Sequence, residues 1–361
     1  MIRDKRDSKQ FKQKTFSGYK KSDVRQAFYK SLDSKNVESS CNWLLECLLS
    51  GYIRETWEYI CLYYCQFVHV NNPELLRYIH QKHQLIQQMC HGLSMDQCIE
   101  LRNNQTLLQC MISTIVCMIQ TSINVKYSLP KIKREDFQLA NLQMKLHSQM
   151  NILPDNIVRF NEPPELKLVM NEIYYHLQSK LNAFDKISYW IYWILEWERI
   201  NRKNKIAWNL QMRQVDVPDR YKSDVIWILW DTVQTYVNKQ TKQLKQDFQI
   251  LYNMYCDQFD RSKRKKRIPY LLNVISLCTT KRKMIPLYKK LPELIQSQCN
   301  YYSIIESKKI YEQLSDTNIE STIKKNKIQQ MPKKSKINIL EEQTKQKLED
   351  FNEIDRMFFN A

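Results

Sequence analysis

The sequence predicts an all-α protein, a two-lobed helical bundle with flexible basic termini. Apolar residues recur at three- and four-residue steps along most of the chain, which is the period of an amphipathic helix. Glycine is scarce, with only Gly18, Gly51 and Gly92 among 361 residues. So few glycines fit poorly with the many tight hairpins of an all-β protein.

The same composition excludes several classes of protein. With 43% hydrophobic and 11% aromatic residues, intrinsic disorder cannot describe the whole chain. Neither a G-x-x-x-x-G-K-[ST] nor a G-x-G-x-x-G motif occurs, so nucleotide-dependent enzymes of these two kinds are excluded. The 56 basic residues exceed the 38 acidic ones and leave a net charge of +18, which favours a polyanionic partner.

Changes in composition divide the chain into five parts. These are a disordered basic arm (1–21), an N-terminal helical lobe (22–123), a connecting segment (124–163), a second helical lobe with a basic cluster (164–314), and a disordered Lys-rich tail (315–361) with a terminal helix over 340–359. Three prolines lie in the connecting segment and a fourth, Pro164, follows directly after it, and hydrophobic residues become sparse in the tail.

The first lobe contains five predicted helices. Val24, Phe28 and Leu32 recur at a four-residue step, the pattern of one helical face. The helices are expected over residues 22–32, 36–49, 56–68, 75–90 and 105–119. Gly51 suits a left-handed cap at the end of the second of them.

The second lobe contains the most hydrophobic helices, expected over 164–182, 185–201, 222–237, 241–259, 269–278 and 286–305. Two of them carry tryptophan and aliphatic residues on every face, which is typical of the middle of a bundle. Residues 188–193 also have high β-propensity and could form a strand. The length of the two tryptophan-rich segments and the polar residues that flank them favour helices.

The chain carries no sign of export. The N-terminal residues are charged and lack the apolar region of a secretory signal. The longest apolar stretches, 110–119 and 187–195, are far shorter than the roughly 20 residues of a membrane helix. The eleven cysteines lie mostly at helical spacing in apolar stretches, so we predict reduced core residues of a cytosolic or nuclear protein.

Residues 24–75 resemble the C-terminal helical collar of clamp-loader-type, replication-associated AAA+ ATPases. The residues that carry this resemblance are Ala27, Lys30-Ser31-Leu32, Val37-Glu38, Cys41, Trp43-Leu44, Leu48, Ser50-Gly51 and Asn72-Pro73. In those proteins the region drives oligomerisation through helix packing. The ATPase core has no counterpart here, so the resemblance implies protein partners bound through the helical lobe, without ATP hydrolysis.

A larger part of the chain, from residue 22 to about 311, resembles a family of uncharacterised helical proteins of large nucleocytoplasmic DNA viruses. The matching blocks are Lys21-Ser22-Asp23-Val24-Arg25, Tyr189-Trp190-Ile191, Tyr221-Lys222-Ser223-Asp224-Val225-Ile226-Trp227 and Lys265-Lys266-Arg267. This resemblance implies a viral protein in the host nucleus or a cytoplasmic virus factory, and implies no particular activity.

Three side chains suggest zinc by their type but not by their spacing. Cys61, Cys65 and His69 follow one helical stripe, and zinc accepts thiolate and imidazole ligands. Ligands eight residues apart on a straight helix are about 12 Å apart, too far to share one ion. We therefore interpret them as core residues and predict no metal and no cofactor.

No residue is predicted to be catalytic, so we predict that the chain is not an enzyme. Glu196, Glu198, Asp224 and Asp231 flank the tryptophan-rich helices. A buried carboxyl group can support acid–base chemistry, but ion pairs with Arg199, Arg202 or Arg220 are the preferred interpretation. His147 and His176 are isolated in the sequence and are interpreted as structural residues.

The basic clusters are the strongest functional signal. The predicted nucleic-acid-binding residues are Arg261, Lys263, Arg264, Lys265, Lys266, Arg267, Lys281, Arg282 and Lys283. Without a recognised base-reading motif, binding through the phosphate backbone is expected. A nuclear import signal over 263–267 and an ordinary solvated face are the alternatives.

Together these observations predict a non-enzymatic basic helical accessory protein of DNA replication, repair or packaging. It would bind nucleic acid, most readily DNA, without sequence preference, and bind protein partners through helix packing. The alternative is a virion structural or protein-interaction protein whose lysines neutralise packaged genome.

Overall fold

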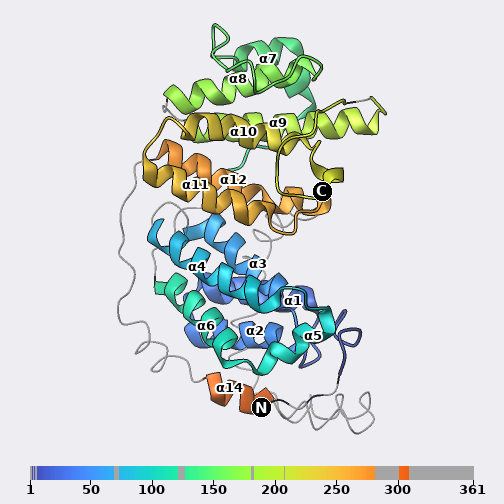
Figure 1. Ribbon diagram of the computed structural model, residues 1–361, viewed down its shortest axis with the longest axis vertical. Helices are drawn as coiled ribbons and strands as arrows, with labels where there is room; N and C mark the ends of the chain where they lie inside the picture. The colour runs from blue at the N-terminus through green and yellow to red at the C-terminus, as the bar shows by residue number, and fades with distance from the viewer. Residues whose placement is uncertain are drawn as a thin grey trace. The chain divides into compact units, whose positions relative to one another are not determined.

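The computed structural model describes residues 2, 4, 6–68, 73–120, 127–179, 183–206, 208–280 and 301–308. These residues are helical or irregular and form no strand, apart from one isolated bridge between Lys14 and Lys20. The all-α prediction is therefore confirmed (Figure 1).

The chain divides into two compact units. Unit 1 comprises Met1–Tyr63, Tyr78–Ser122 and Pro286–Ala361, and unit 2 comprises Tyr64–Arg77 and Ile123–Ile285. Two lobes were expected, but the division runs differently, because Tyr64–Arg77 belongs to the second unit. In that unit the π-helix η1 (Tyr64–Val68) packs on α12 (Arg264–Thr279), where Asn273 Nδ2 donates to Cys65 Sγ at 3.5 Å.

Unit 1 is built from helices that the hydrophobic pattern predicts. They are α1 (Lys21–Asp33), α2 (Val37–Leu49), α3 (Ile53–Tyr63), α4 (Pro73–Cys90, of which Tyr78 onward belongs here), α5 (Met95–Glu100), the 3-10 turn η3 (Leu101–Asn103), α6 (Gln105–Gln120) and α14 (Tyr301–Lys308). Phe28, Leu32 and Leu44 are fully buried where α1 packs on α2. The Asn36 side chain caps α2 by accepting from the Ser39 amide at 2.9 Å.

The prediction of a disordered basic arm over residues 1–21 is wrong for those of its residues that the structure describes. Phe11 and Phe16 are each 1% exposed and share a hydrophobic cluster with Leu49 and Tyr52. The Phe16 amide also donates to the Ser50 hydroxyl at 2.8 Å. Two phenylalanines in a basic segment provide enough apolar area to fold it onto α2.

A helix expected in the second lobe belongs to unit 1. Helix α14 packs on α2, and Lys308 Nζ donates to the buried carboxylate of Glu46 at 2.6 Å. Glu46 also accepts from the Ser17 amide and hydroxyl, each at 2.7 Å. Burial raises the pKa of Glu46, but Lys308 and these hydrogen bonds outweigh it, so the pKa lies below its usual value.

Unit 2 is organised around tryptophan-rich helices. Besides η1 and α12 it contains η4 (Arg134–Phe137), α7 (Leu139–Lys145), α8 (Pro164–Ser179), α9 (Ala183–Lys203), η5 (Asp219–Tyr221), α10 (Val225–Val237), α11 (Lys242–Cys256) and η6 (Arg261–Lys263). Trp190, Trp227 and Trp230 are each at most 1% exposed. Residues 188–193 lie within α9, so the strand alternative is wrong.

The expected connecting segment is folded into unit 2 over its described residues. The Asp136 carboxylate accepts from the Tyr189 hydroxyl at 3.0 Å, and its backbone carbonyl accepts from Trp193 Nε1 at 2.9 Å. These bonds attach η4 to α9. Prolines therefore mark a change from long helices to short ones here, and not a linker between domains.

The structure also bears on two expectations about the chain as a whole. None of the described helices combines the length and apolar character that crossing a bilayer requires. The ten cysteines among the described residues are all buried, and none of these ten is in a disulfide, which agrees with their interpretation as reduced core residues.

The Lys-rich tail, 315–361, and its predicted terminal helix lie outside the described residues.

Candidate nucleic-acid interface and other polar clusters

The basic cluster lies in η6 and the first turn of α12, and two of its arginines, Arg261 and Arg264, form ion pairs within unit 2. Arg264 Nη1 lies 2.7 Å from the Asp224 carboxylate, and Arg264 Nη2 lies 2.5 Å from that of Glu198. Arg261 contacts the same two carboxylates, at 2.8 Å from Glu198 and 3.4 Å from Asp224. The Arg202 guanidinium is a third partner of Glu198.

This arginine–carboxylate network is a structural element of unit 2. Glu198 and Asp224 are buried, and Asp224 also caps α10 by accepting from the Ile226 amide at 3.1 Å. Burial raises the pKa of Glu198, but Arg264, Arg202 and Arg261 outweigh it and hold the pKa below its ordinary value. The network therefore joins the C-terminal part of α9 to the starts of α10 and α12.

Arg267 is also engaged inside the unit. Its side chain is buried, and Nη1 donates to the backbone carbonyls of Tyr255 at 2.9 Å and Asp257 at 2.5 Å. These two carbonyls belong to the C-terminal end of α11 and the turn that follows it. Such carbonyls lack helical partners and attract cations, so Arg267 closes the end of α11.

The lysines of the cluster are more accessible than Arg267. Lys263, Lys265 and Lys266 are partly exposed, and Lys263 Nζ lies 3.5 Å from the Gln258 carbonyl. Burial lowers the pKa of Lys265, partly offset by Glu196. Arg261 remains half exposed despite its ion pairs. Lys281, Arg282 and Lys283 lie outside the described residues.

The preferred interpretation of the acidic residues in α9 is confirmed. Glu196 pairs with Arg199 at 2.5 Å, and Glu198 pairs with Arg202. Asp231 lies 3.5 Å from Arg213 Nε, a partner that the sequence did not suggest. Arg220 instead stacks over the ring of Tyr221 at 4.7 Å.

The three residues considered as zinc ligands, Cys61, Cys65 and His69, do not all belong to one unit. Cys61 belongs to α3 in unit 1, whereas Cys65 belongs to η1 in unit 2, and both are buried. Burial raises the pKa of Cys65 to about 12, which leaves its thiol protonated at neutral pH. His69 lies outside the described residues.

Sequence reasoning missed a different cluster, formed by His147, Glu172 and His176. Their nitrogen and carboxylate ligand atoms lie within 4.8 Å of one another. Glu172 and His176 are four residues apart on α8, a spacing that places them on one helical face. That spacing was visible in the sequence, whereas the approach of His147, 25 residues from Glu172, was not.

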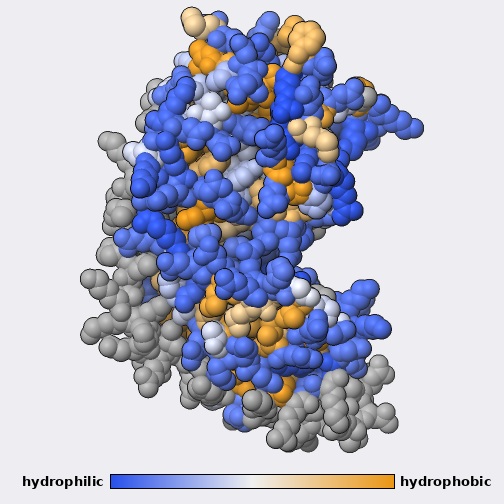
Figure 2. Space-filling model, viewed as in Figure 1, coloured by the Kyte–Doolittle hydropathy of each residue, from blue (hydrophilic) through white to orange (hydrophobic). Residues whose placement is uncertain are grey.

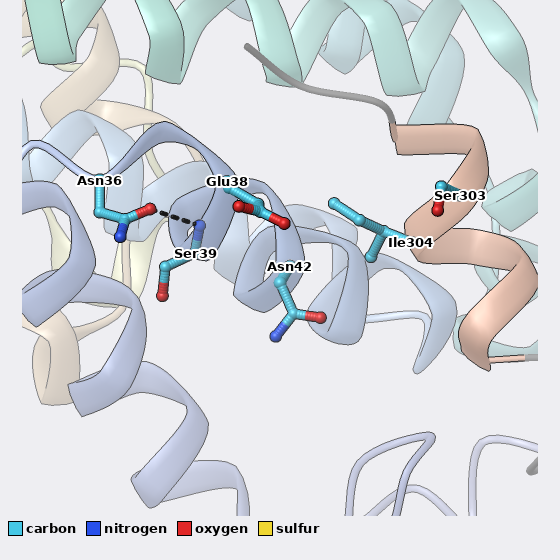
Figure 3. Close-up of a pocket in the computed structure, with 6 residues that line it drawn as sticks. All are labelled: Asn36, Glu38, Ser39, Asn42, Ser303 and Ile304. Carbon is cyan, nitrogen blue, oxygen red and sulfur yellow. Dashed lines mark hydrogen bonds between the residues drawn. The ribbon is translucent and has the colours of Figure 1, made fainter. Parts of the chain in front are cut away.

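A hollow of about 370 Å³ in unit 1 offers no arrangement for catalysis. Figure 3 shows its lining side chains from α2 and α14, with Ile304 extending toward α2. The lining residues are Asn36, Glu38, Ser39, Asn42, Ser303 and Ile304. The Asn36 carboxamide oxygen is occupied by the capping bond to Ser39, and Glu38 is the one titratable group among the described lining residues.

Large hydrophobic side chains reach the surface in unit 2. Hydrophilic residues cover most of the face shown in Figure 2, but hydrophobic ones appear near α7 and α8. Phe160 is fully exposed, and Leu139, Met144 and Met150 are each at least 69% exposed. All four belong to the expected connecting segment. Exposed apolar side chains are typical of interaction surfaces where they form a contiguous patch, whereas scattered ones are ordinary.

Comparisons with protein-family models, with curated proteins and with solved structures give no match. The resemblances to helical collars and to a viral protein family therefore stay predictions from the residues that carry them.

Proposed function

We propose that the chain is a non-enzymatic, basic nucleic-acid-binding accessory protein that contacts the phosphate backbone without reading sequence. The net charge of +18 is the observation that carries this proposal. Neutralised phosphates release condensed counterions, and this release drives binding of basic proteins to DNA. Replication, repair or packaging of DNA is the setting that the collar and viral resemblances imply.

The accessible cations at the start of α12 are the proposed contact surface in unit 2. Arg264 and Arg267 hold the helix in place through Glu198, Asp224 and backbone carbonyls. Lys263, Lys265 and Lys266 are partly exposed and Arg261 is half exposed, and these are the cations that we propose contact phosphate. Arg264 and Arg267 thus have a structural role, and the more exposed cations would bind the phosphates.

The test is a titration of labelled duplex DNA with the full chain over a salt series. Each phosphate contact contributes a slope of about −0.9 to the dependence of log affinity on log salt. The variant K263Q/K265Q should weaken binding to all sequences alike and make the slope shallower by about 2 if both lysines contact phosphate. The matched control, K242Q/K245Q, removes two exposed lysines of α11 and should leave the slope closer to that of the wild type.

Binding that does not respond to salt, or that falls equally in both variants, would contradict this interface. In that case a second function gains support, that of a virion structural or protein-interaction protein. The exposed Leu139, Met144, Met150 and Phe160 favour it. These residues lie in unit 2, whereas the collar resemblance placed partner binding in the N-terminal lobe.

A further inference from the structure

The side chains of His147, Glu172 and His176 converge although they come from different segments. Glu172 and His176 project from α8, and His147 lies just after α7. Glu172 fixes the position of His147 by accepting backbone amides, that of His147 at 3.1 Å and that of Ser148 at 2.8 Å. The segment that carries His147 is thus held on α8 by the backbone, independently of the imidazole ring.

The distances suit a small metal ion. His176 Nε2 lies 3.4 Å from Glu172 Oε2, which is the separation of about 3.4 Å between two ligands on a tetrahedral ion with bonds near 2.1 Å. His147 Nδ1 lies 4.0 Å from the same oxygen. The His147 side chain is 39% exposed, so a small rotation of its ring can close the remaining gap.

His176 lacks the partners expected of a structural histidine. It is 1% exposed, and neither of its ring nitrogens forms a hydrogen bond. The Glu172 oxygen at 3.4 Å is close enough for electrostatic attraction, but it does not satisfy hydrogen-bond geometry. A buried polar nitrogen without a partner is costly, and a metal ion in the cluster would provide that partner.

The local electrostatics favour a cation. The Glu172 carboxylate accepts the backbone amides of His147 and Ser148 and faces the buried His176 imidazole, so a carboxylate and an imidazole point into the same place. His147 Nδ1 also lies 2.7 Å from the Lys145 carbonyl, and this nitrogen would give up that contact to bind an ion.

We propose that His147, Glu172 and His176 form a binding site for a divalent transition-metal ion of the Zn²⁺ class. Two imidazoles and one carboxylate match Zn²⁺, whereas Ca²⁺ and Mg²⁺ prefer oxygen ligands alone. Three protein ligands leave a fourth position for water on the side of the exposed His147. The bound ion would fasten the segment after α7 to α8.

The test uses the purified full chain, first stripped with a chelator and then titrated with Zn²⁺ by calorimetry and with Co²⁺ by visible absorption. We expect one ion per chain and cobalt d–d bands without a thiolate charge-transfer band. Replacing a ligand in H147A should weaken binding by more than the roughly 10–100-fold that loss of an outer-shell partner causes. The matched control is H91A, because His91 is exposed and lies outside the cluster.

H147A alters an exposed ring and should keep the fold, which circular dichroism would verify. E172Q is a second variant, which removes the carboxylate charge while keeping an acceptor for the amides of His147 and Ser148. Equal metal affinity in the wild type and H147A, a thiolate-to-cobalt band, or less than one ion per chain would overturn the proposal. The DNA titration above is independent, because these residues contribute no cation to the α12 surface.

Discussion

At the scale of single residues, the basic cluster contains two kinds of cation that its sequence does not distinguish: arginines that anchor α12 and lysines that remain accessible to solvent. A run of six cations in seven residues suggests one uniform charged surface. In the structure, Arg264 and Arg267 are enclosed by acceptors, while Lys263 and Lys265 retain contact with solvent. Arginine suits the inner positions, because its planar guanidinium can bond two acceptors at once.

The Arg264 network should be a strong stabiliser of unit 2. Replacing Arg264 by methionine would leave the buried Glu198 and Asp224 with the more exposed Arg261 and Arg202 as partners. Removing one partner from a buried ion pair costs about 3–5 kcal/mol, and the remaining arginines place our expectation near the lower end, about 3 kcal/mol. Urea unfolding, followed by tryptophan fluorescence, would measure this loss.

The matched control is R199M. Arg199 is 64% exposed and pairs with Glu196 one turn away, so its loss should cost less than about 1 kcal/mol. Equal destabilisation by both substitutions would mean that the Arg264 pairs contribute no more to unit 2 than a surface ion pair does.

At the scale of elements, the end of α2 was predictable because it depends on neighbouring residues. Gly51 has a φ of +79°, as expected of a left-handed cap. The Tyr52 amide donates to the Cys47 carbonyl at 3.1 Å, and the Gly51 amide donates to Leu48 at 3.0 Å. These two bonds form a Schellman motif. The start of α12 was not predictable in this way, because its anchors Glu198 and Asp224 are 66 and 40 residues away.

Gly51 should tolerate no side chain, for two separate reasons. A left-handed conformation costs an alanine about 1–2 kcal/mol, and a Cβ here would lie 2.5 Å from Ile99 Cγ1. The overlap adds about 1–3 kcal/mol. Gly92 supplies the control, because its φ is +71° but nothing lies within 4 Å of the place that a Cβ would occupy.

We therefore expect G51A to lower the free energy of unfolding of unit 1 by about 2–5 kcal/mol and G92A by about 1–2 kcal/mol. Hydrogen exchange of α2 and α5 in the two variants would separate the effect of the overlap from that of the backbone. Equal losses would show that Ile99 moves aside without cost.

At the scale of the whole molecule, the hydrophobic pattern predicted most helices but not their partners. Helices α9 and α10 follow from local apolar periodicity, and both lie where the pattern placed them. The packing of η1 on α12 joins Cys65 to Asn273 across 208 residues, and no local pattern encodes such a contact. Because local patterns do not encode contacts between distant residues, the cluster of His147 with Glu172 and His176 was not predicted. For the same reason the predicted boundary at residue 123 does not separate two complete units.

That boundary can be tested by splitting the chain between residues 123 and 124. The N-terminal fragment would carry Tyr64–Arg77 without the rest of unit 2, exposing side chains that are 0–2% exposed in the intact chain: Tyr64, Cys65, Phe67 and Val68. Expressed alone, it should bind a hydrophobic dye and self-associate.

Co-expressed with the fragment 124–361, the same piece should form a stable complex, because residues 64–77 complete the core of unit 2. Substituting Cys65, which is fully buried beside Asn273, by aspartate should weaken the complex, since an unpaired buried carboxylate is strongly unfavourable, although α14 also joins the fragments by packing on α2. The exposed Gln84 of α4 supplies the control Q84D, which should leave the complex intact. Two soluble monomeric fragments that do not associate would contradict this division of the chain and would support the boundary that the prolines suggested.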